Sequence, residues 1–140
     1  MNGFIIKAKL PSLNDVIAKN RTNKHYANKF KQDIEELIGW EIKQALTTRS
    51  LHPVQKPCEI YVEWHEATKR RDVDNIQSSF KFIGDALVKH GILKNDSRRY
   101  LKQIHHTIID DTRDFVYVKI YEEGANNENL QNGKNGKVNP

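Results

Sequence analysis

The sequence predicts one small α/β domain with a mixed β-sheet and two main helices, in the order β-α-β-α-β-β. Short segments in which apolar and polar side chains alternate are typical of strands. Two longer segments carry apolar side chains at three- and four-residue spacing, which is typical of amphipathic helices. With 140 residues, the chain has room for one core, and we find no internal repeat.

The first half of the chain predicts a strand, a helix and a second strand. Residues 4–10 begin apolar and then alternate, and the turn-forming residues 11–15 end this strand. From about residue 27 to 46, the apolar spacing predicts a helix long enough to cover one face of a sheet. Residues 58–64 alternate and are rich in β-forming side chains, which indicates a strand.

The second half predicts another helix and two more strands. The helix covers about residues 74–90, and Gly91 stands where a glycine commonly ends a helix. Residues 99–109 and 114–122 have the pattern of strands. A strand-helix-strand unit favours a right-handed parallel crossover, whereas the last two strands, joined through residues 110–113, are expected to form an antiparallel hairpin.

The ends of the chain and its single cysteine bear on domain limits and location. The domain is predicted to cover residues 1–123, and the Asn-, Gly- and Lys-rich residues 124–140 are predicted to be a disordered polar tail. The first residues lack the pattern of a signal peptide, and no apolar segment is long enough to cross a bilayer. Because Cys58 is the only cysteine, no intrachain disulfide can form. Together these features predict a cytoplasmic protein without a membrane partner.

The chain is basic, with 23 Lys and Arg against 18 Asp and Glu and a formal net charge of +5. A basic protein favours polyanions, because each neutralised phosphate releases condensed counterions. Acidic membranes are attracted by the same charge, so composition alone does not establish a nucleic-acid partner.

A pair of carboxylates, Asp72 and Asp74, stands between the second predicted strand and the second helix. If these residues are extended, both side chains project to the same side and form an oxygen site suited to Mg²⁺. The alternative is structural: Asp74 caps the helix and Asp72 is a solvated loop residue. Basic residues that can hold phosphates directly precede the pair: Lys69, Arg70 and Arg71.

Asp96, in the loop after this helix, is a candidate third carboxylate. It can approach Asp72 and Asp74 only if its loop folds over them, and an ordinary loop role is equally compatible with the spacing. Lys81 can stabilise negative charge on a reacting phosphate, or it can form an i,i+4 ion pair with Asp85. Further basic residues flank Asp96: Lys94, Arg98 and Arg99.

Three segments in order, residues 71–76 (RDVDNI), 81–87 (KFIGDAL) and 91–96 (GILKND), resemble the RusA family of Holliday-junction resolvases. The family pattern has an R-D-x-D-N opening, a helix with a lysine and D-A-L, and then a glycine and an acidic turn. Residues 10–14 (LPSLN) are similar to the P-S-x-N segment after the family's first strand. The order of strands and helices also matches, and the resemblance extends over about residues 4–122.

The resemblance implies a homodimeric, Mg²⁺-dependent endodeoxyribonuclease of phage or prophage type that nicks two opposed strands of a four-way DNA junction in recombination and repair. It implies that Asp72, Asp74 and Asp96 bind the Mg²⁺, for which Mn²⁺ can substitute, and that a helix lysine assists. The common position of this lysine is occupied here by Ser78. Lys81 is therefore the candidate, as if about one helical turn had been inserted.

Other functions remain open at this point. A non-catalytic branched-DNA-binding protein with the same fold is the main alternative. A phosphatase with a DxD motif is disfavoured, because its first aspartate directly follows an apolar strand. Zinc is disfavoured because the adjacent His105 and His106 face opposite sides of a strand. The spacing after Asp72 lacks the glycine and glutamate of an EF-hand.

Overall fold

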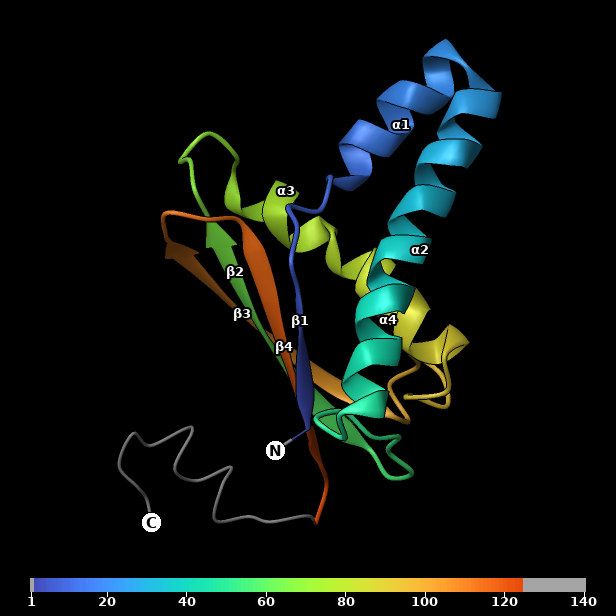
Figure 1. The fold of residues 1–140 in the computed structure, drawn as a ribbon, viewed down its shortest axis with the longest axis vertical. Helices are drawn as coiled ribbons and strands as arrows, with labels where there is room; N and C mark the ends of the chain where they lie inside the picture. Colours follow the sequence, from blue (N-terminus) through green and yellow to red (C-terminus); the bar gives the residue numbers. More distant parts are fainter. Residues whose placement is uncertain (1, 125–140) are drawn as a thin grey trace.

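The computed structural model describes residues 2–124, which form a four-stranded sheet with helices on one side (Figure 1). The strand order is β1-β4-β2-β3, in which β2 is parallel to β3 and antiparallel to β4, and β1 is antiparallel to β4. The strands are β1 (Gly3–Ile6), β2 (Cys58–Glu66), β3 (Leu101–Asp110) and β4 (Phe115–Glu122). The predicted tail, apart from Gly124, lies outside the described residues.

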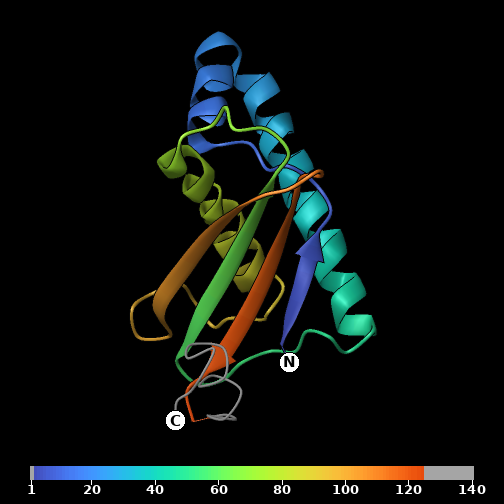
Figure 2. The same ribbon diagram turned by 90° about the vertical axis from the view of Figure 1, so that its left-hand side faces the viewer.

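The helices lie on one face of the sheet, as Figures 1 and 2 show from two directions. They are α1 (Leu13–Thr22), α2 (Lys24–Thr47), α3 (Val73–Ser78) and α4 (Phe80–Lys89). The predicted mixed α/β class is therefore confirmed. No helix within the described part of the chain is long and apolar enough to cross a membrane.

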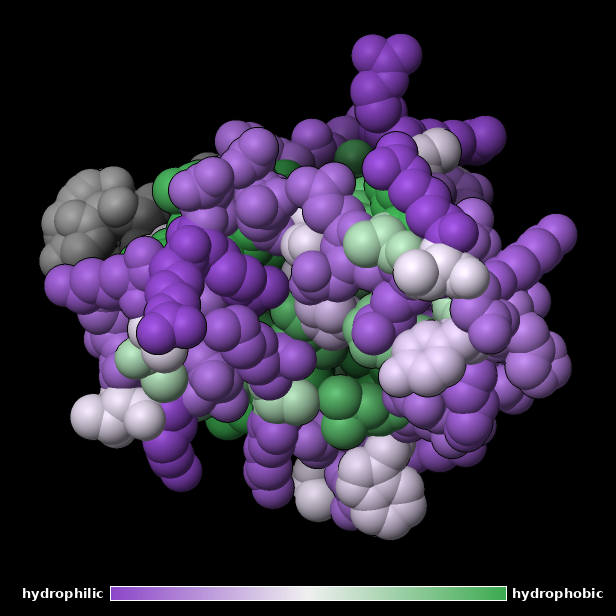
Figure 3. Space-filling model, turned by 90° about the horizontal axis from the view of Figure 1, so that it is seen from above, coloured by the Kyte–Doolittle hydropathy of each residue, from purple (hydrophilic) through white to green (hydrophobic). Residues whose placement is uncertain are grey.

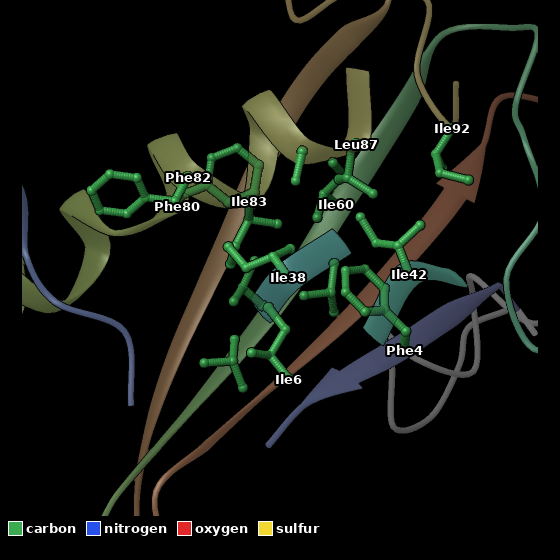
Figure 4. Packing of buried hydrophobic residues seen from close by; sticks show 14 of the residues in the cluster. Phe4, Ile6, Ile38, Ile42, Ile60, Phe80, Phe82, Ile83, Leu87 and Ile92 are labelled. Carbon is green, nitrogen blue, oxygen red and sulfur yellow. The ribbon is translucent and has the colours of Figure 1, made fainter. Parts of the chain in front are cut away.

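The core fills the space between the sheet and helices α2 and α4. In β2, every second side chain from Cys58 to Glu66 is buried, because alternate residues face the helices. Figure 4 shows how apolar side chains from sheet and helices point toward one another. The labelled members of this cluster are Phe4, Ile6, Ile38, Ile42, Ile60, Phe80, Phe82, Ile83, Leu87 and Ile92.

The segment after the first strand differs from the prediction, because it forms helix α1 where only a turn was expected. The Ser12 side chain accepts a hydrogen bond from the Asp15 N–H, and the Asp15 carboxylate accepts one from the Ser12 N–H. This reciprocal capping box starts a helix. The predicted second helix is divided at Ser79 into α3 and α4.

The predicted hairpin between the last two strands is wrong. β3 and β4 are not neighbours, because each pairs with β2 from the opposite side. After helices α3 and α4, β3 pairs in parallel with one edge of β2. β4 therefore pairs with the other edge of β2. The chain between them passes over the end of β2, where the Asp111 N–H donates to the Glu66 carbonyl oxygen at 3.0 Å.

His106 contacts the core from the inner face of β3. Its Nδ1 accepts a hydrogen bond of 2.9 Å from the Nε1–H of Trp64, whose side chain is buried. Burial lowers the pKa of His106, and the neighbouring His105 lowers it further. The folded protein therefore favours neutral His106, whereas the unfolded chain takes up a proton near the ordinary histidine pKa of about 6.5.

We predict that acidification from about pH 7 to pH 5 lowers the free energy of unfolding, partly through His106. The sign follows because the unfolded state binds more protons than the folded state in this window. His106→Asn keeps an acceptor for Trp64 but does not titrate, so its stability should depend less steeply on pH. Urea unfolding at a fixed protein concentration measures both slopes, and equal slopes would contradict the assignment.

Candidate functional site

Asp72 and Asp74 lie where the chain leaves the carboxyl end of β2 and enters α3. Asp72 is the N-cap residue, with an extended backbone (φ −72°, ψ 156°), and Asp74 is in the first turn. Because α3 starts at Val73, the alternation expected of an extended segment does not apply to this pair. The alternative in which Asp74 caps the helix and Asp72 is a loop residue also changes, because Asp72 rather than Asp74 is the N-cap residue.

Both carboxylates are exposed. Asp72 makes no side-chain capping hydrogen bond, and Oδ1 of Asp74 accepts one from the Asn75 N–H at 3.0 Å. Neither carboxylate forms an ion pair with another residue in the range 2–124. The pair is therefore accessible to a cation, and carboxylate oxygens are the ligands that Mg²⁺ takes in proteins.

The start of α1 is joined to the Asp72–Asp74 segment, although some 60 residues of sequence separate them. The Asn14 side chain donates to Oδ1 of Asn75 at 2.9 Å. Two further hydrogen bonds join the Leu13 N–H to Ser78 Oγ at 3.2 Å and Ser79 Oγ to the Pro11 carbonyl at 2.8 Å. Two of the segments that carry the family resemblance are thus brought into contact.

Arg71 links this segment to the end of β2 and to the segment that precedes α1. Its guanidinium binds the buried Glu66 carboxylate through two nitrogens, Nη2 at 2.7 Å and Nε at 3.2 Å. Its third nitrogen donates to the Leu10 carbonyl at 2.8 Å. The Arg71 side chain is 16% exposed and that of Glu66 is 5% exposed. Arg71, predicted as a DNA contact, is therefore committed to contacts inside the protein.

Asp96 lies toward the other end of the sheet. The Leu101 N–H donates to the Ser97 carbonyl at 2.9 Å, and Leu101 pairs with Cys58 at the beginning of β2. Figure 1 accordingly shows the loop between α4 and β3 far from the start of α3. Within the described residues, no three His, Cys, Asp or Glu side chains are grouped so that they could hold a metal ion. A single chain does not bring the predicted three carboxylates together.

Lys81 forms the i,i+4 ion pair that the spacing allowed. Its Nζ lies 3.1 Å from Oδ1 of Asp85. The hydrogen bond and charge of Asp85 raise the pKa of Lys81, and the negative charge of Asp96 raises it further. Ser78, at the family's usual lysine position, donates to the Asn75 carbonyl at 2.7 Å. Asp85, one turn later in α4, is therefore the residue that pairs with Lys81.

The predicted basic residues fall into two groups. Lys69 and Arg70 are exposed near Asp72, and Lys69 lies 3.6 Å from the Asp110 carboxylate. Figure 3 looks onto the molecule from above this end and shows a mainly hydrophilic surface. The second group belongs to the loop of Asp96 and contains the exposed residues Lys94, Arg98 and Arg99. One basic group therefore lies near Asp72 and Asp74, and the other lies near Asp96.

Glu66 is the residue of this region that sequence reasoning missed. Its alternation within β2 places it on the buried face, where a carboxylate requires a partner. An arginine five residues later, in a segment that must turn back toward the helices, was the available signal. The capping-box spacing of Ser12 and Asp15 was a comparable signal for α1.

We predict that Arg71→Ala lowers the free energy of unfolding by about 3 kcal/mol, because it leaves the Glu66 charge buried without a partner. The matched control is Arg70→Ala, which removes an exposed neighbouring arginine and should change stability by less than about 0.5 kcal/mol. Urea unfolding of both variants measures the difference. Equal stability losses would show that the Glu66–Arg71 pair does not hold this region together.

The sequence was compared with protein-family models and with curated proteins, and neither comparison found a match.

Proposed function

We propose that this protein is a Mg²⁺-dependent endodeoxyribonuclease of the RusA type, which resolves four-way DNA junctions by paired nicks. The observation that carries this proposal is the pair of exposed, unpaired carboxylates of Asp72 and Asp74, held in place by contacts between segments 10–14 and 71–79. These segments carry the resemblance to the family, and their contact gives them a common structural role.

Asp72 and Asp74 are the residues of one chain that would hold the metal. Bound there, Mg²⁺ would polarise a phosphodiester and lower the pKa of a coordinated water. The products expected are a 5′-phosphate and a 3′-hydroxyl. Lys69 and Arg70 are free of buried contacts and would bind the DNA backbone beside this pair, whereas Arg71 would position the pair through Glu66. Phosphate contacts orient DNA of a particular shape without reading its sequence.

The third carboxylate, in this proposal, comes from a second chain. Asp96 lies toward the opposite end of β2 from Asp72 and Asp74, as the pairing of Leu101 with Cys58 requires. We therefore propose that Asp96 of the partner subunit completes each site in a two-fold dimer. Such a dimer contains two equivalent sites, which two symmetric cuts require. The charge of Asp96 acts on Lys81 of the same chain, so the partner subunit's Lys81 would enter each site together with the partner subunit's Asp96.

The same separation of Asp96 from the pair favours a second candidate, a branched-DNA-binding protein without nuclease activity. This candidate requires the exposed basic residues but no assembled metal site. Binding and cleavage assays on one labelled four-way junction distinguish the two functions, because only the endonuclease produces Mg²⁺-dependent nicks.

Asp74→Asn should reduce cleavage of a four-way junction at least about a hundredfold, because it removes a metal-binding carboxylate. Junction binding should be preserved or improved, because the variant loses a negative charge. Asp33→Asn, at an exposed carboxylate of α2, is the matched control and should cleave as the wild type does. EDTA should abolish cleavage by the wild type. A folded Asp74→Asn protein that still cleaves would remove this residue from the site.

Mixing two inactive variants tests whether the site is shared between chains. If Asp96 acts in the partner's site, a heterodimer of Asp74→Asn and Asp96→Asn chains contains one intact site. After random exchange of subunits, the mixture should therefore nick junctions at about a quarter of the wild-type rate. If Asp96 acts within its own chain, both sites of the heterodimer are defective. A mixture of co-refolded chains that remains inactive would contradict the shared site.

A further inference from the structure

A hollow lies at the corner of the sheet where β1 ends and β4 begins. Figure 2 shows why these segments meet, because the connection between β3 and β4 reaches over the end of β2 and returns beside the end of β1. The hollow has a volume of about 340 Å³ and is lined by Ile5, Lys7, Arg113, Asp114 and Phe115. Ligand pockets in proteins start at about 300 Å³, so the hollow is large enough for a small planar group.

The floor of this hollow is apolar and faces away from the helices. The alternation of β1 places Ile5 on the face opposite the core, where it is 41% exposed. Phe115 lies on the same face of the adjacent β4, because the next residue, Val116, is buried in the core. The Phe115 ring is stacked on the His65 ring, with centroids 3.9 Å apart and 13° between the planes. Aromatic surfaces are where unpaired bases stack in proteins that bind single strands.

Two cationic side chains line this hollow and have no anionic partner among residues 2–124. Lys7 and Arg113 are exposed, and neither belongs to an ion pair in that range. The Arg113 guanidinium lies 5.7 Å from the centre of the Phe115 ring. Oδ1 of the remaining polar residue, Asp114, accepts the Ala67 N–H at 2.8 Å. The hollow therefore offers two positive charges beside an apolar floor, which matches the phosphate and the planar base of a nucleotide.

The hollow lies at the same end of the sheet as Asp72 and Asp74. The loop that lines it is hydrogen bonded to Ala67, at the start of the segment that leads to Asp72. The other lining segment, after β1, continues to the Leu10 carbonyl that Arg71 binds. A DNA strand held at the two aspartates can therefore continue toward the hollow along the exposed basic loop between them.

We propose that this hollow binds one unpaired nucleotide of a DNA strand, with its phosphates on Lys7 and Arg113 and its base against Ile5 and Phe115. The choice of DNA rests on the proposed function, whereas the site itself is separate from the metal-binding carboxylates. An unpaired nucleotide is favoured over duplex DNA, because bases within a duplex are stacked on one another and offer no free face to the apolar floor. Such a site retains a strand that leaves the branch point of a junction.

DNA binding in EDTA tests the phosphate contacts without any cleavage. For a short labelled oligothymidine, Lys7→Ala/Arg113→Ala should raise the dissociation constant at least about tenfold, and the slope of log affinity against log salt should fall by about 1.4, because two phosphate contacts are lost. Fluorescence anisotropy measures both.

The matched control is Lys24→Ala/Lys43→Ala, which removes two exposed lysines of α2 and changes the net charge equally. It should bind within about twofold of the wild type, and circular dichroism should show that both double variants are folded. Equal losses of affinity in the two variants would show an effect of net charge alone and would overturn the site.

The contact with the base is tested by removing the bases from the DNA. The wild type should bind the oligothymidine at least about fivefold more tightly than an abasic strand of equal length, which retains the phosphates. Ile5→Ala should reduce this preference, whereas Ile17→Ala, at an exposed isoleucine of α1, is the matched control and should retain it. A wild type without this preference, or Ile5→Ala with the full preference, would overturn the proposal.

These measurements are independent of nuclease activity. A protein that meets all of these expectations but cuts no junction would contradict the proposed function alone. A protein that cuts junctions, and whose oligothymidine binding is unchanged by Lys7→Ala/Arg113→Ala, would overturn the nucleotide site alone.

Discussion

The Glu66 carboxylate is buried at the end of the central strand, and the structure around the candidate site depends on its neutralisation by Arg71. A buried carboxylate without a cation would be strongly unfavourable. The planar guanidinium meets the requirement with two parallel contacts and has a third nitrogen left for the Leu10 carbonyl. One side chain thus fixes the exit of β2, the entry to α3 and the segment before α1. The exposed Asp72 and Asp74 are held in place by a contact in which neither takes part.

The parts of the fold that follow from local patterns could be predicted from the sequence. β2 and α2 occur close to their expected positions, because their apolar periodicity records which side faces the core. Helix α1 was missed, although Ser12 and Asp15 have the spacing of a capping box, because proline and asparagine suggested a turn. Strand pairing could not be read in this way. β3 and β4 are adjacent in sequence, but both pair with β2, and that preference arises from the packing of the whole sheet.

In the candidate site, too, the features set by neighbouring residues could be predicted, whereas those set by residues distant in the sequence could not. The spacing of Asp72 and Asp74 correctly drew attention to an exposed pair at the end of a strand. The spacing of Asp96 could not show which end of the sheet its loop would occupy, because that depends on the length of α3 and α4 and on the pairing of Leu101 with Cys58. Arg71 resembled its two basic neighbours in sequence, and only burial distinguishes it from the exposed Arg70.

The position of β4 between β1 and β2 has a consequence for the order in which the protein acquires its structure during synthesis. β1 is made first, but its only strand partner among the described residues is β4, which is made last. The ribosome must therefore deliver residues 115–122 before the N-terminal strand can join the sheet. Helices α1 and α2 contact each other over a short sequence distance and can associate much earlier. Until translation reaches β4, the nascent chain carries an unpaired apolar strand, which is the kind of segment that chaperones shield.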